Sequence, residues 1–560
     1  MPVRRRFTLF SRESFLLLLL IIFHSIILVF YVSHHMHGAP LFGDEADKIS
    51  QAAKYYFSGD MEVLDGAPYP PLLYFTTQPL FKCFGVSKTV AVSTNIIFII
   101  LLVVSTFWIA MKLAPGTGYG LLAAGIVMVF PGTIALSRIY YQDFANIAMT
   151  STAMAFLLAS RGFTSRKWTL AFGLVSGLGM LTRGNFCIFL FGPAAGVLAM
   201  SMLGIAHWGY EIAPQERSRM RIIFNVALGF ILSVAVASIW YLRDYPVVIN
   251  FGLQRVTLEA NAAEVVRHNP KSIFFYLYSL IDYQISELLF IPVAALGIWG
   301  VARRFTVTLP LLLCILVGYL VFVFPEWKLA RYVAPMLPAF AVLLAVGAAS
   351  VKCSILRVII IIFCILTGTM QYAFLTFPSR FSEEYFIGAG RLAAPLLGYR
   401  MGIDDYQDDI PKPISNTNFH IKETGEVLRE FMEKRAVKNK DSKDAVFNPF
   451  TMSCFAEAVL IPDEPGSQSL IDCGYEWPYV SAVYNLNMRV IQSYLHPDGK
   501  VELHPSPDFI AADLDPGNSD IIACFDPKLI EIFGLQDKYD SLGSWHIAGN
   551  GIPMHLYGKK

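Results

Sequence analysis

Apolar stretches of membrane-span length recur along the first two thirds of the chain, and they limit the fold more than any other feature. A helix needs roughly 20 apolar residues to cross about 30 Å of hydrocarbon, and only helices or closed barrels satisfy the backbone inside a bilayer. Of the 560 residues, 55% are hydrophobic and 16% are charged. This composition excludes an ordinary soluble globular protein. The sequence therefore predicts a polytopic α-helical membrane protein.

We expect about eleven membrane spans, which are assigned from hydropathy and length. They lie near residues 14–32, 90–110, 120–136, 145–160, 168–182, 186–206, 222–242, 286–301, 307–324, 333–350 and 355–376. The first could instead be a cleaved signal peptide, but no small-residue cleavage site of the Ala-x-Ala kind follows Val32. An uncleaved first span is the preferred interpretation.

Basic residues are concentrated in alternate loops, which predicts the topology. Clusters of Lys and Arg mark the cytoplasmic side of a membrane protein. They occur before the first span and near residues 112, 161–167, 217–221, 303–304 and 352–357. The amino terminus is therefore expected in the cytoplasm, whereas loops 33–89 and 243–285 and the tail face outward. We expect a multi-pass protein of the plasma (inner) membrane with a periplasmic or extracellular carboxyl-terminal domain.

The tail has a different composition from the rest of the chain. From Phe381 onward charged residues, Pro, Asn and Asp become frequent, and residues 403–415 form an acidic, Pro-punctuated connector. A helix is predicted at 421–437, and strand-like runs occur at 444–448, 488–494, 519–525 and 544–557. The predicted domains are thus a membrane module at 1–376, which includes the outer loop 33–89, and a small α/β domain at 377–560. Within the tail, Cys454, Cys473 and Cys524 leave a disulfide open as an alternative to free thiols.

Acidic residues stand at two places where lipid meets water. Asp44 and Glu45 follow the first span, and Asp143 precedes the fourth. Apolar surroundings oppose the ionised form of a carboxyl group unless a partner or substrate compensates. Each acid also stands where a helix is expected to begin, so helix N-capping is the competing interpretation for Asp44 and Asp143.

Cations and aromatic residues are expected on the same outer face. The cations are Arg138, Arg183, Arg243 and Arg331, and the accompanying residues are Tyr69, Pro70, Pro71, Tyr141 and Tyr332. Each has an ordinary structural explanation, such as snorkelling, a helix-dipole contact or a polyproline turn. Together they gather two acid sites and several cations at one depth, where a polyprenyl phosphate headgroup would lie. The net charge of +1 gives no indication of a nucleic-acid partner.

The order of these motifs resembles GT-C glycosyltransferases. Asp44-Glu45 and Tyr69-Pro70-Pro71-Leu72 in the first outer loop are followed by Tyr140-Tyr141-Gln142-Asp143, Leu181-Thr182-Arg183-Gly184 and Arg331-Tyr332 with two later prolines. This order is similar to the branch that contains protein O-mannosyltransferases and the lipid A aminoarabinose transferase (glycosyltransferase family 39-like). The resemblance covers about residues 1–350. Related enzymes often have Lys before the Pro-Pro-Leu, whereas this chain has Tyr69.

The resemblance implies a reaction. The donor would be a hexose or pentose on polyprenyl phosphate, and the acceptor a hydroxyl group of a protein, lipid or glycan, which attacks with inversion. Asp44 would be the base, with Glu45 and Asp143 shaping the acceptor side. Arg183 and Arg331, or Arg138 and Arg243, would bind the donor phosphate. No nucleotide is required, no metal ligands are identified, and a divalent metal is optional.

Two other functional classes stay open. An oligosaccharide ligase or polymerase acting on diphosphate-linked lipids would also need a large outer loop and arginines. A transporter or lipid flippase would also carry charges within the membrane. Against transport, the charged motifs cluster at one face, and paired broken helices near mid-bilayer are not evident in the sequence.

Overall fold

The computed structural model describes residues 12–35, 45–64, 69–114, 116–205, 218–243, 273–324, 329–377, 452–454, 521–524, 536–537, 539–547 and 552–559. The chain divides into two compact units. The first comprises Met1–Tyr31, Asp65–Thr77 and Val92–Pro413, and the second comprises Val32–Leu64, Gln78–Ala91 and Ile414–Lys560. The first long loop is therefore divided between the two units, with Asp65–Thr77 in the first and the rest in the second.

The first unit is a bundle of helices. It contains α1 (Arg12–Phe30), α5 (Asn95–Leu113), α6 (Thr117–Val129), α7 (Pro131–Ser137), α8 (Gln142–Ala159), α9 (Arg166–Met180), α10 (Phe186–Leu203), α11 (Arg219–Tyr241), α13 (Phe275–Ser279), the π-helix η5 (Leu280–Gln284), α14 (Glu287–Arg303), α15 (Phe305–Val323), the 3₁₀-helix η6 (Ala330–Met336), α16 (Leu337–Ser350) and α17 (Ser354–Thr376). The π-helix η1 (Tyr31–His35) follows α1, and α3 (Leu72–Phe84) begins in this unit.

Helices occupy every segment that we expected to cross the membrane. Among the described residues, seven helices are long and apolar enough to span a bilayer, or up to nine if each of two bent pairs is one span. A helical, multi-pass architecture is therefore confirmed. The count of eleven stays a prediction, because α8 and α9 are not among the helices that meet the length and hydropathy requirements.

One predicted span, at 120–136, is broken rather than straight. The axes of α6 and α7 differ by 66° at a break before Pro131. Proline is favoured at the first position of a helix but cannot continue the preceding one, since it lacks an N–H donor. The break at Pro131 thus divides one apolar run into two shorter helices. A second bend of 112° separates the α13–η5 segment from α14, where Ser286 has a φ of +79°. This bend lies at the start of the predicted span at 286–301, which α14 forms as one helix.

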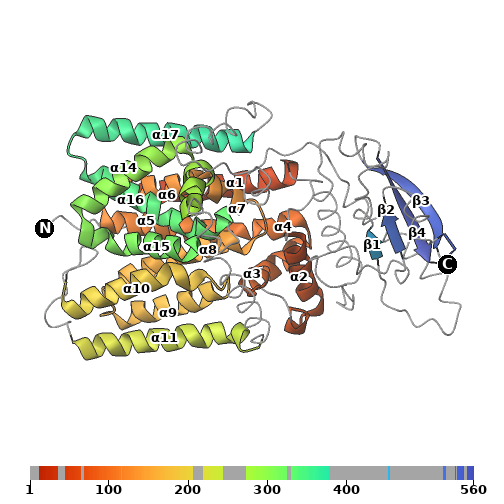
Figure 1. The fold of residues 1–560 in the computed structure, drawn as a ribbon, viewed down its shortest axis with the longest axis horizontal. Helices are drawn as coiled ribbons and strands as arrows, with labels where there is room; N and C mark the ends of the chain where they lie inside the picture. Colours follow the sequence, from red (N-terminus) through yellow and green to blue (C-terminus); the bar gives the residue numbers. More distant parts are fainter. Residues whose placement is uncertain are drawn as a thin grey trace. The chain divides into compact units, whose positions relative to one another are not determined.

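Helix α8 lies at the centre of the bundle. It packs against α5, α9, α10 and η6, and most of its side chains are buried. Figure 1 shows α11 at one edge of the bundle and α17 at the other. Helix α11 packs closely on α9. The contact is so close that a Cβ atom added to Gly173 would lie 2.2 Å from the carbonyl oxygen of Gly229. Small residues at helix contacts allow this close approach within a membrane.

The second unit combines short helices with a sheet. Its helices are α2 (Glu45–Ser58), the 3₁₀-helix η2 (Met61–Leu64) and α4 (Lys88–Ser93), whose last residues belong to the first unit. Helix α2 buries Ile49, Ala52 and Ala53 on one face. The Gln78 side chain, on the second part of α3, donates a hydrogen bond to the Ala52 carbonyl at 3.3 Å.

The sheet of the second unit has four strands in the order β1-β2-β4-β3. They are β1 (Met452–Cys454), β2 (Ile521–Cys524), β3 (Tyr539–Ile547) and β4 (Ile552–Lys559). β1 and β2 are parallel, and the other pairs are antiparallel. The run expected at 519–525 corresponds to β2, whereas the single run at 544–557 covers the facing ends of two strands. The predicted helix at 421–437 and the runs at 444–448 and 488–494 lie outside the described residues.

Candidate active site

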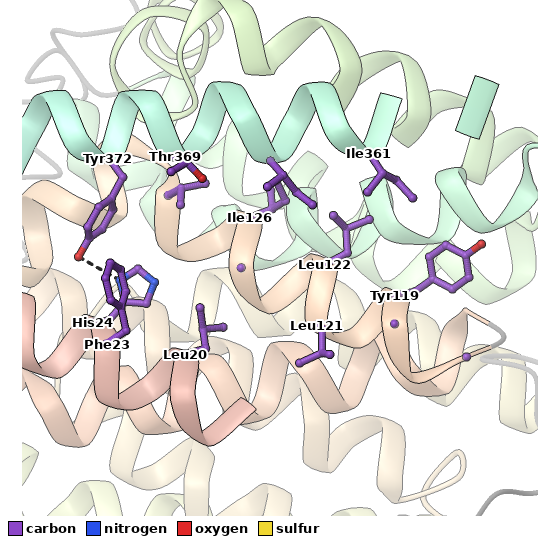
Figure 2. Close-up of a pocket in the computed structure, with 15 residues that line it drawn as sticks. Leu20, Phe23, His24, Tyr119, Leu121, Leu122, Ile126, Ile361, Thr369 and Tyr372 are labelled. Atoms are coloured by element: carbon purple, nitrogen blue, oxygen red, sulfur yellow. Dashed lines mark hydrogen bonds between the residues drawn. The ribbon is translucent and has the colours of Figure 1, made fainter. Parts of the chain in front are cut away.

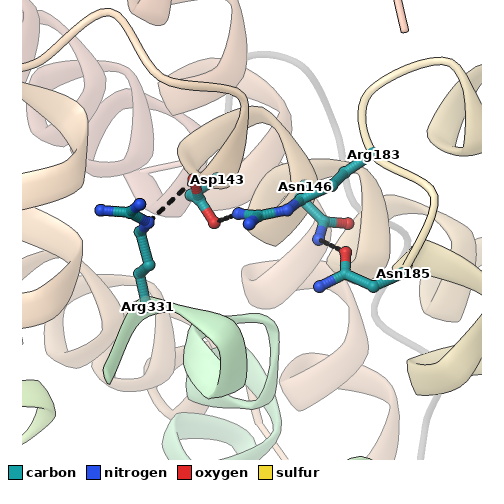
Figure 3. Close-up of polar contacts among 5 residues, drawn as sticks. All are labelled: Asp143, Asn146, Arg183, Asn185 and Arg331. Carbon is teal, nitrogen blue, oxygen red and sulfur yellow. Dashed lines mark hydrogen bonds and ion pairs between the residues drawn. The ribbon is translucent and has the colours of Figure 1, made fainter. Parts of the chain in front are cut away.

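One carboxylate and two guanidinium groups from three separate segments meet in the first unit. Asp143 lies in the first turn of α8, Arg183 in the turn between α9 and α10, and Arg331 in η6 (Figure 3). The Asp143 carboxylate forms an ion pair with Arg183, and its Oδ2 lies 3.8 Å from Nε of Arg331. All three side chains are about nine-tenths buried. Counted alone, the trio carries a formal charge of +1.

Tyrosine rings lie beneath both guanidinium groups. The Arg183 guanidinium carbon is 4.9 Å from the ring centre of Tyr332, and that of Arg331 is 5.1 Å from the ring centre of Tyr141. Cation–π contacts of this kind hold a guanidinium in one plane. The arginines therefore have a fixed orientation toward Asp143.

Asp143 does not act as the N-cap of α8. The capping position is Tyr141, whose backbone is extended and whose side chain makes no capping hydrogen bond. Asp143 is the second residue of the helix, where a negative charge interacts favourably with the helix dipole. Its carboxylate is directed to the arginines (Figure 3), so the capping interpretation of this acid is wrong.

The connector that leads into α8 is held by several hydrogen bonds. The Asn95 side chain donates to the carbonyl oxygens of Ser137 and Ile139, each at 2.9 Å. The buried Tyr140 hydroxyl lies 2.7 Å from Oγ1 of Thr77. These bonds tie the start of α8 to α3 and α5, which fixes the position of Asp143.

The Tyr-Pro-Pro-Leu segment adjoins the same turn as Arg183. The backbone N–H of Leu72 donates a hydrogen bond to the carbonyl oxygen of Leu181 at 2.9 Å. Pro70 and Pro71 are buried, and Tyr69 is half-buried. Two motifs that are about 110 residues apart in the sequence are therefore neighbours in the structure.

Two asparagines next to the trio were not assigned a role from the sequence. Nδ2 of Asn146 donates to Oδ1 of Asn185 at 3.0 Å (Figure 3). Asn146 is one turn after Asp143 on α8, and Asn185 is two residues after Arg183. The i, i+3 spacing could have placed Asn146 on the face of Asp143, but nothing in the sequence identifies Asn185 as its partner.

Arg138 and Arg243 lie in other surroundings. Arg138 donates hydrogen bonds to the carbonyl oxygen of Leu375 at 2.7 Å and to Oγ1 of Thr376 at 2.6 Å. Its guanidinium also lies 3.9 Å from the ring centre of Tyr31. This arginine therefore joins the carboxyl-terminal ends of α1 and α17. Arg243 is exposed just beyond α11.

The carboxylate pair of the first loop is described only in part. Asp44 lies outside the described residues. Glu45 is the first residue of α2 in the second unit, and its side chain is fully buried and interacts electrostatically with Lys88. No group of three or more His, Cys, Asp or Glu side chains in the described part of the chain is arranged to hold a metal ion.

Comparison with known proteins finds a family match over part of the chain. Residues 46–247 match the family described as dolichyl-phosphate-mannose-protein mannosyltransferase. The resemblance to GT-C glycosyltransferases is confirmed. The matched region includes Asp143 and Arg183 but ends before Arg331. No curated protein matches the chain by sequence.

Similar solved structures show the fold. ArnT from Cupriavidus metallidurans in the apo state superposes with a TM-score of 0.50 at 13% identity, and the alignment covers 98% of both chains. The same protein bound to undecaprenyl phosphate gives 0.49 at 14% identity with 98% coverage of both. The archaeal oligosaccharyltransferase AglB from Archaeoglobus fulgidus gives 0.43 at 12% identity, covering 79% of this chain and 62% of AglB. The chain thus has an ArnT-like fold.

Proposed function

We propose that this protein is a glycosyltransferase that moves a sugar from polyprenyl phosphate to an acceptor hydroxyl at the outer face of the membrane, with inversion. The convergence of Arg183 and Arg331 on one buried carboxylate carries the proposal. Buried cations in a membrane protein are costly and mark functional sites. The family match and the ArnT-like fold support the same reaction class.

Arg183 and Arg331 are proposed to bind the donor phosphate. A guanidinium carries five N–H donors in a planar fork, so it can contact a carboxylate and a phosphate at once. Two such groups suit a leaving group with a single phosphate, since they stabilise the negative charge that develops as the glycosidic bond breaks. ArnT, which has a similar fold, binds undecaprenyl phosphate.

Asp143 is proposed to position the arginines. Its carboxylate contacts both guanidinium groups, and Tyr332 and Tyr141 support them from the other side. A donor phosphate would then meet two forks that are already oriented, which lowers the cost of reorganisation during the reaction.

Asp44 is proposed as the base that takes the proton from the acceptor hydroxyl, with Glu45 beside it. Attack of the hydroxyl oxygen on the anomeric carbon forms the new glycosidic bond, and the bond to the phosphate oxygen breaks on the opposite face. The proton passes to the Asp44 carboxylate. Arg138, which binds the end of α17, and the exposed Arg243 are not included in the proposed phosphate site.

The reaction is tested by incubating purified protein with a panel of polyprenyl-phosphate sugars, with and without EDTA, and measuring sugar release or transfer. Turnover of a monophosphate-linked monosaccharide is expected. Turnover of only a diphosphate-linked glycan would replace the proposal with an oligosaccharide ligase. Movement of the lipid across vesicles without any bond cleavage would replace it with a flippase.

Substitution of Asp44 tests the assignment of the base. Asp44→Asn should lower the transfer rate by about 100- to 10,000-fold, as expected when a positioned base is lost. Asn can still cap a helix, so folding should be retained. Asp60→Asn, which changes an exposed acid of the same loop, is the matched control. A well-folded Asp44→Asn protein with a near-normal transfer rate would show that the base is another residue.

A further inference from the structure

A long apolar groove lies between three helices that are not used by the proposed reaction. Its volume is about 610 Å³, and it is lined by α1, α6 and α17 (Figure 2). The lining runs along α6 from Gly116 to Val129, which corresponds to about 20 Å of helix at 1.5 Å per residue. Apolar cavities remain free of water and accept apolar guests. The groove therefore has the length and chemistry of a site for a hydrocarbon chain.

Glycines provide the space along the floor of the groove. A Cβ atom added to Gly118 or Gly125 on α6 would meet no atom within 4 Å. Elsewhere in the bundle, glycines such as Gly173 are in tight contact with a neighbouring helix. The glycines of the groove thus face open space that a guest can fill.

One end of the groove is closed by aromatic and polar contacts between α1 and α17. Nδ1 of His24 lies 3.1 Å from the hydroxyl of Tyr372, and the rings of Phe23 and Tyr372 are 5.9 Å apart. Arg138 lies over the ring of Tyr372 at 5.6 Å and bonds to the last residues of α17. A chain in the groove would therefore end at His24, with its headgroup at the opposite end, near Gly116.

The open end of the groove has two exposed cations near it in the sequence. Thr117 donates a hydrogen bond to Oε1 of Glu13 at 3.1 Å, which joins the first turn of α6 to the first turn of α1. Arg12 adjoins this contact in the sequence, and Lys112 lies four residues before Gly116; both are exposed. Cations at the membrane surface attract anionic headgroups.

From the closed and open ends together, we propose that the groove binds one acyl chain of an anionic bilayer phospholipid. Its phosphate lies at Arg12 and Lys112, and its chain runs along Gly118 and Gly125 toward His24. The site is separate from the proposed donor site at Arg183 and Arg331, so it does not depend on the reaction assigned to this protein.

Native mass spectrometry of the full-length protein in detergent tests the site, with phosphatidylglycerol, phosphatidylcholine and undecaprenyl phosphate as probes. The wild type should retain one phosphatidylglycerol. Gly125→Phe fills the groove from α6, and Thr369→Phe fills it from α17, so each should lose the retained lipid. Ala235→Phe, which adds the same side chain to an exposed position on α11, should retain it. The melting temperature of each variant shows that it is folded.

The headgroup end is tested by removing charge. The double substitution Arg12→Gln and Lys112→Gln should reduce the preference for phosphatidylglycerol over phosphatidylcholine by about fivefold per cation. Arg219→Gln with Arg221→Gln, at the exposed start of α11, is the matched control. The proposal is overturned if both groove-filling variants retain lipid like the wild type, if the wild type does not prefer the anionic phospholipid, or if the groove-filling variants lose undecaprenyl phosphate instead.

Discussion

Replacement of Arg331 is the sharpest test of the phosphate site. The side chain is 8% exposed, its Nε lies 3.8 Å from Oδ2 of Asp143, and its guanidinium stacks 5.1 Å above the ring of Tyr141. Arg331→Ala removes the cation, whereas Arg331→Lys keeps the charge and removes the planar fork. Asp143 retains its ion pair with Arg183 in both variants, so the fold should be preserved.

The expected loss of affinity follows from the geometry. Two unit charges 3.8 Å apart interact by about 4 kcal/mol at an effective dielectric constant of about 20. This value is an upper bound on the binding free energy that a phosphate at a similar distance loses when the charge of Arg331 is removed. Hydrogen bonds to charged groups contribute about 1.5–3 kcal/mol net. Arg331→Ala should therefore weaken the binding of a polyprenyl phosphate by about 10- to 150-fold. Arg331→Lys should weaken it by a smaller factor, because the charge is retained.

The measurement is equilibrium binding of undecaprenyl phosphate to protein in detergent micelles, with a thermal melt of each variant. Arg303→Ala is the matched control, since Arg303 is an exposed arginine that also stacks on an aromatic ring, 4.4 Å from the centre of Trp299. Its affinity should change by less than about twofold. If Arg331→Ala melts like the wild type and binds undecaprenyl phosphate as tightly, Arg331 does not contact the donor phosphate.

Three further predictions concern the trio, its neighbours and the topology. Asp143→Asn should destabilise the protein by about 3–5 kcal/mol, because two buried guanidinium groups lose their shared carboxylate; a thermal melt equal to that of Asp60→Asn would contradict this. Asn146→Leu removes the hydrogen bond to Asn185 and should lower kcat about fivefold, which corresponds to about 1 kcal/mol. The melting temperature should change little. An unchanged kcat would exclude a positioning role for Asn146. A periplasm-active reporter fused after Lys560 should be active and a cytoplasm-active one inactive; the reverse pattern would invert the predicted topology.

Local sequence patterns were sufficient to locate the helices, because each apolar run is long relative to a helical turn. They were not sufficient to locate the breaks within the runs. The stretch around Pro131 is apolar on both sides, so hydropathy alone predicts one helix through it. The bend depends on the missing N–H of the proline and on how α7 packs against α8, α17 and η5. The hairpin of β3 and β4 was similarly merged into one run at 544–557.

The sequence identified individual candidate site residues, but it did not predict which of them are in contact. Asp143 comes just before an apolar run, and Arg183 comes just after another. These positions predicted that both residues lie at the outer ends of helices. Their contact depends on the order in which helices pack, which no local pattern encodes. Arg138 shows the limit most clearly, since its partners Leu375 and Thr376 are more than 230 residues away in the sequence. Long-range pairing of this kind is visible only in the folded chain.

The contact between α9 and α11 links the site to the surrounding bilayer. Only 17% of the apolar window of α11 is buried, so lipid surrounds most of its surface. At its end, the Tyr241 hydroxyl donates a hydrogen bond to the Met180 carbonyl at 3.0 Å, three residues before Arg183. The largely apolar stretch from Ile222 to Tyr241 corresponds to about 30 Å of helix. An apolar stretch that does not match the local hydrocarbon thickness responds by tilting or by changing the thickness of the bilayer around it. Hydrophobic mismatch at α11 would thus be transmitted to the turn that carries Arg183, which makes membrane thickness a determinant of how this arginine is presented.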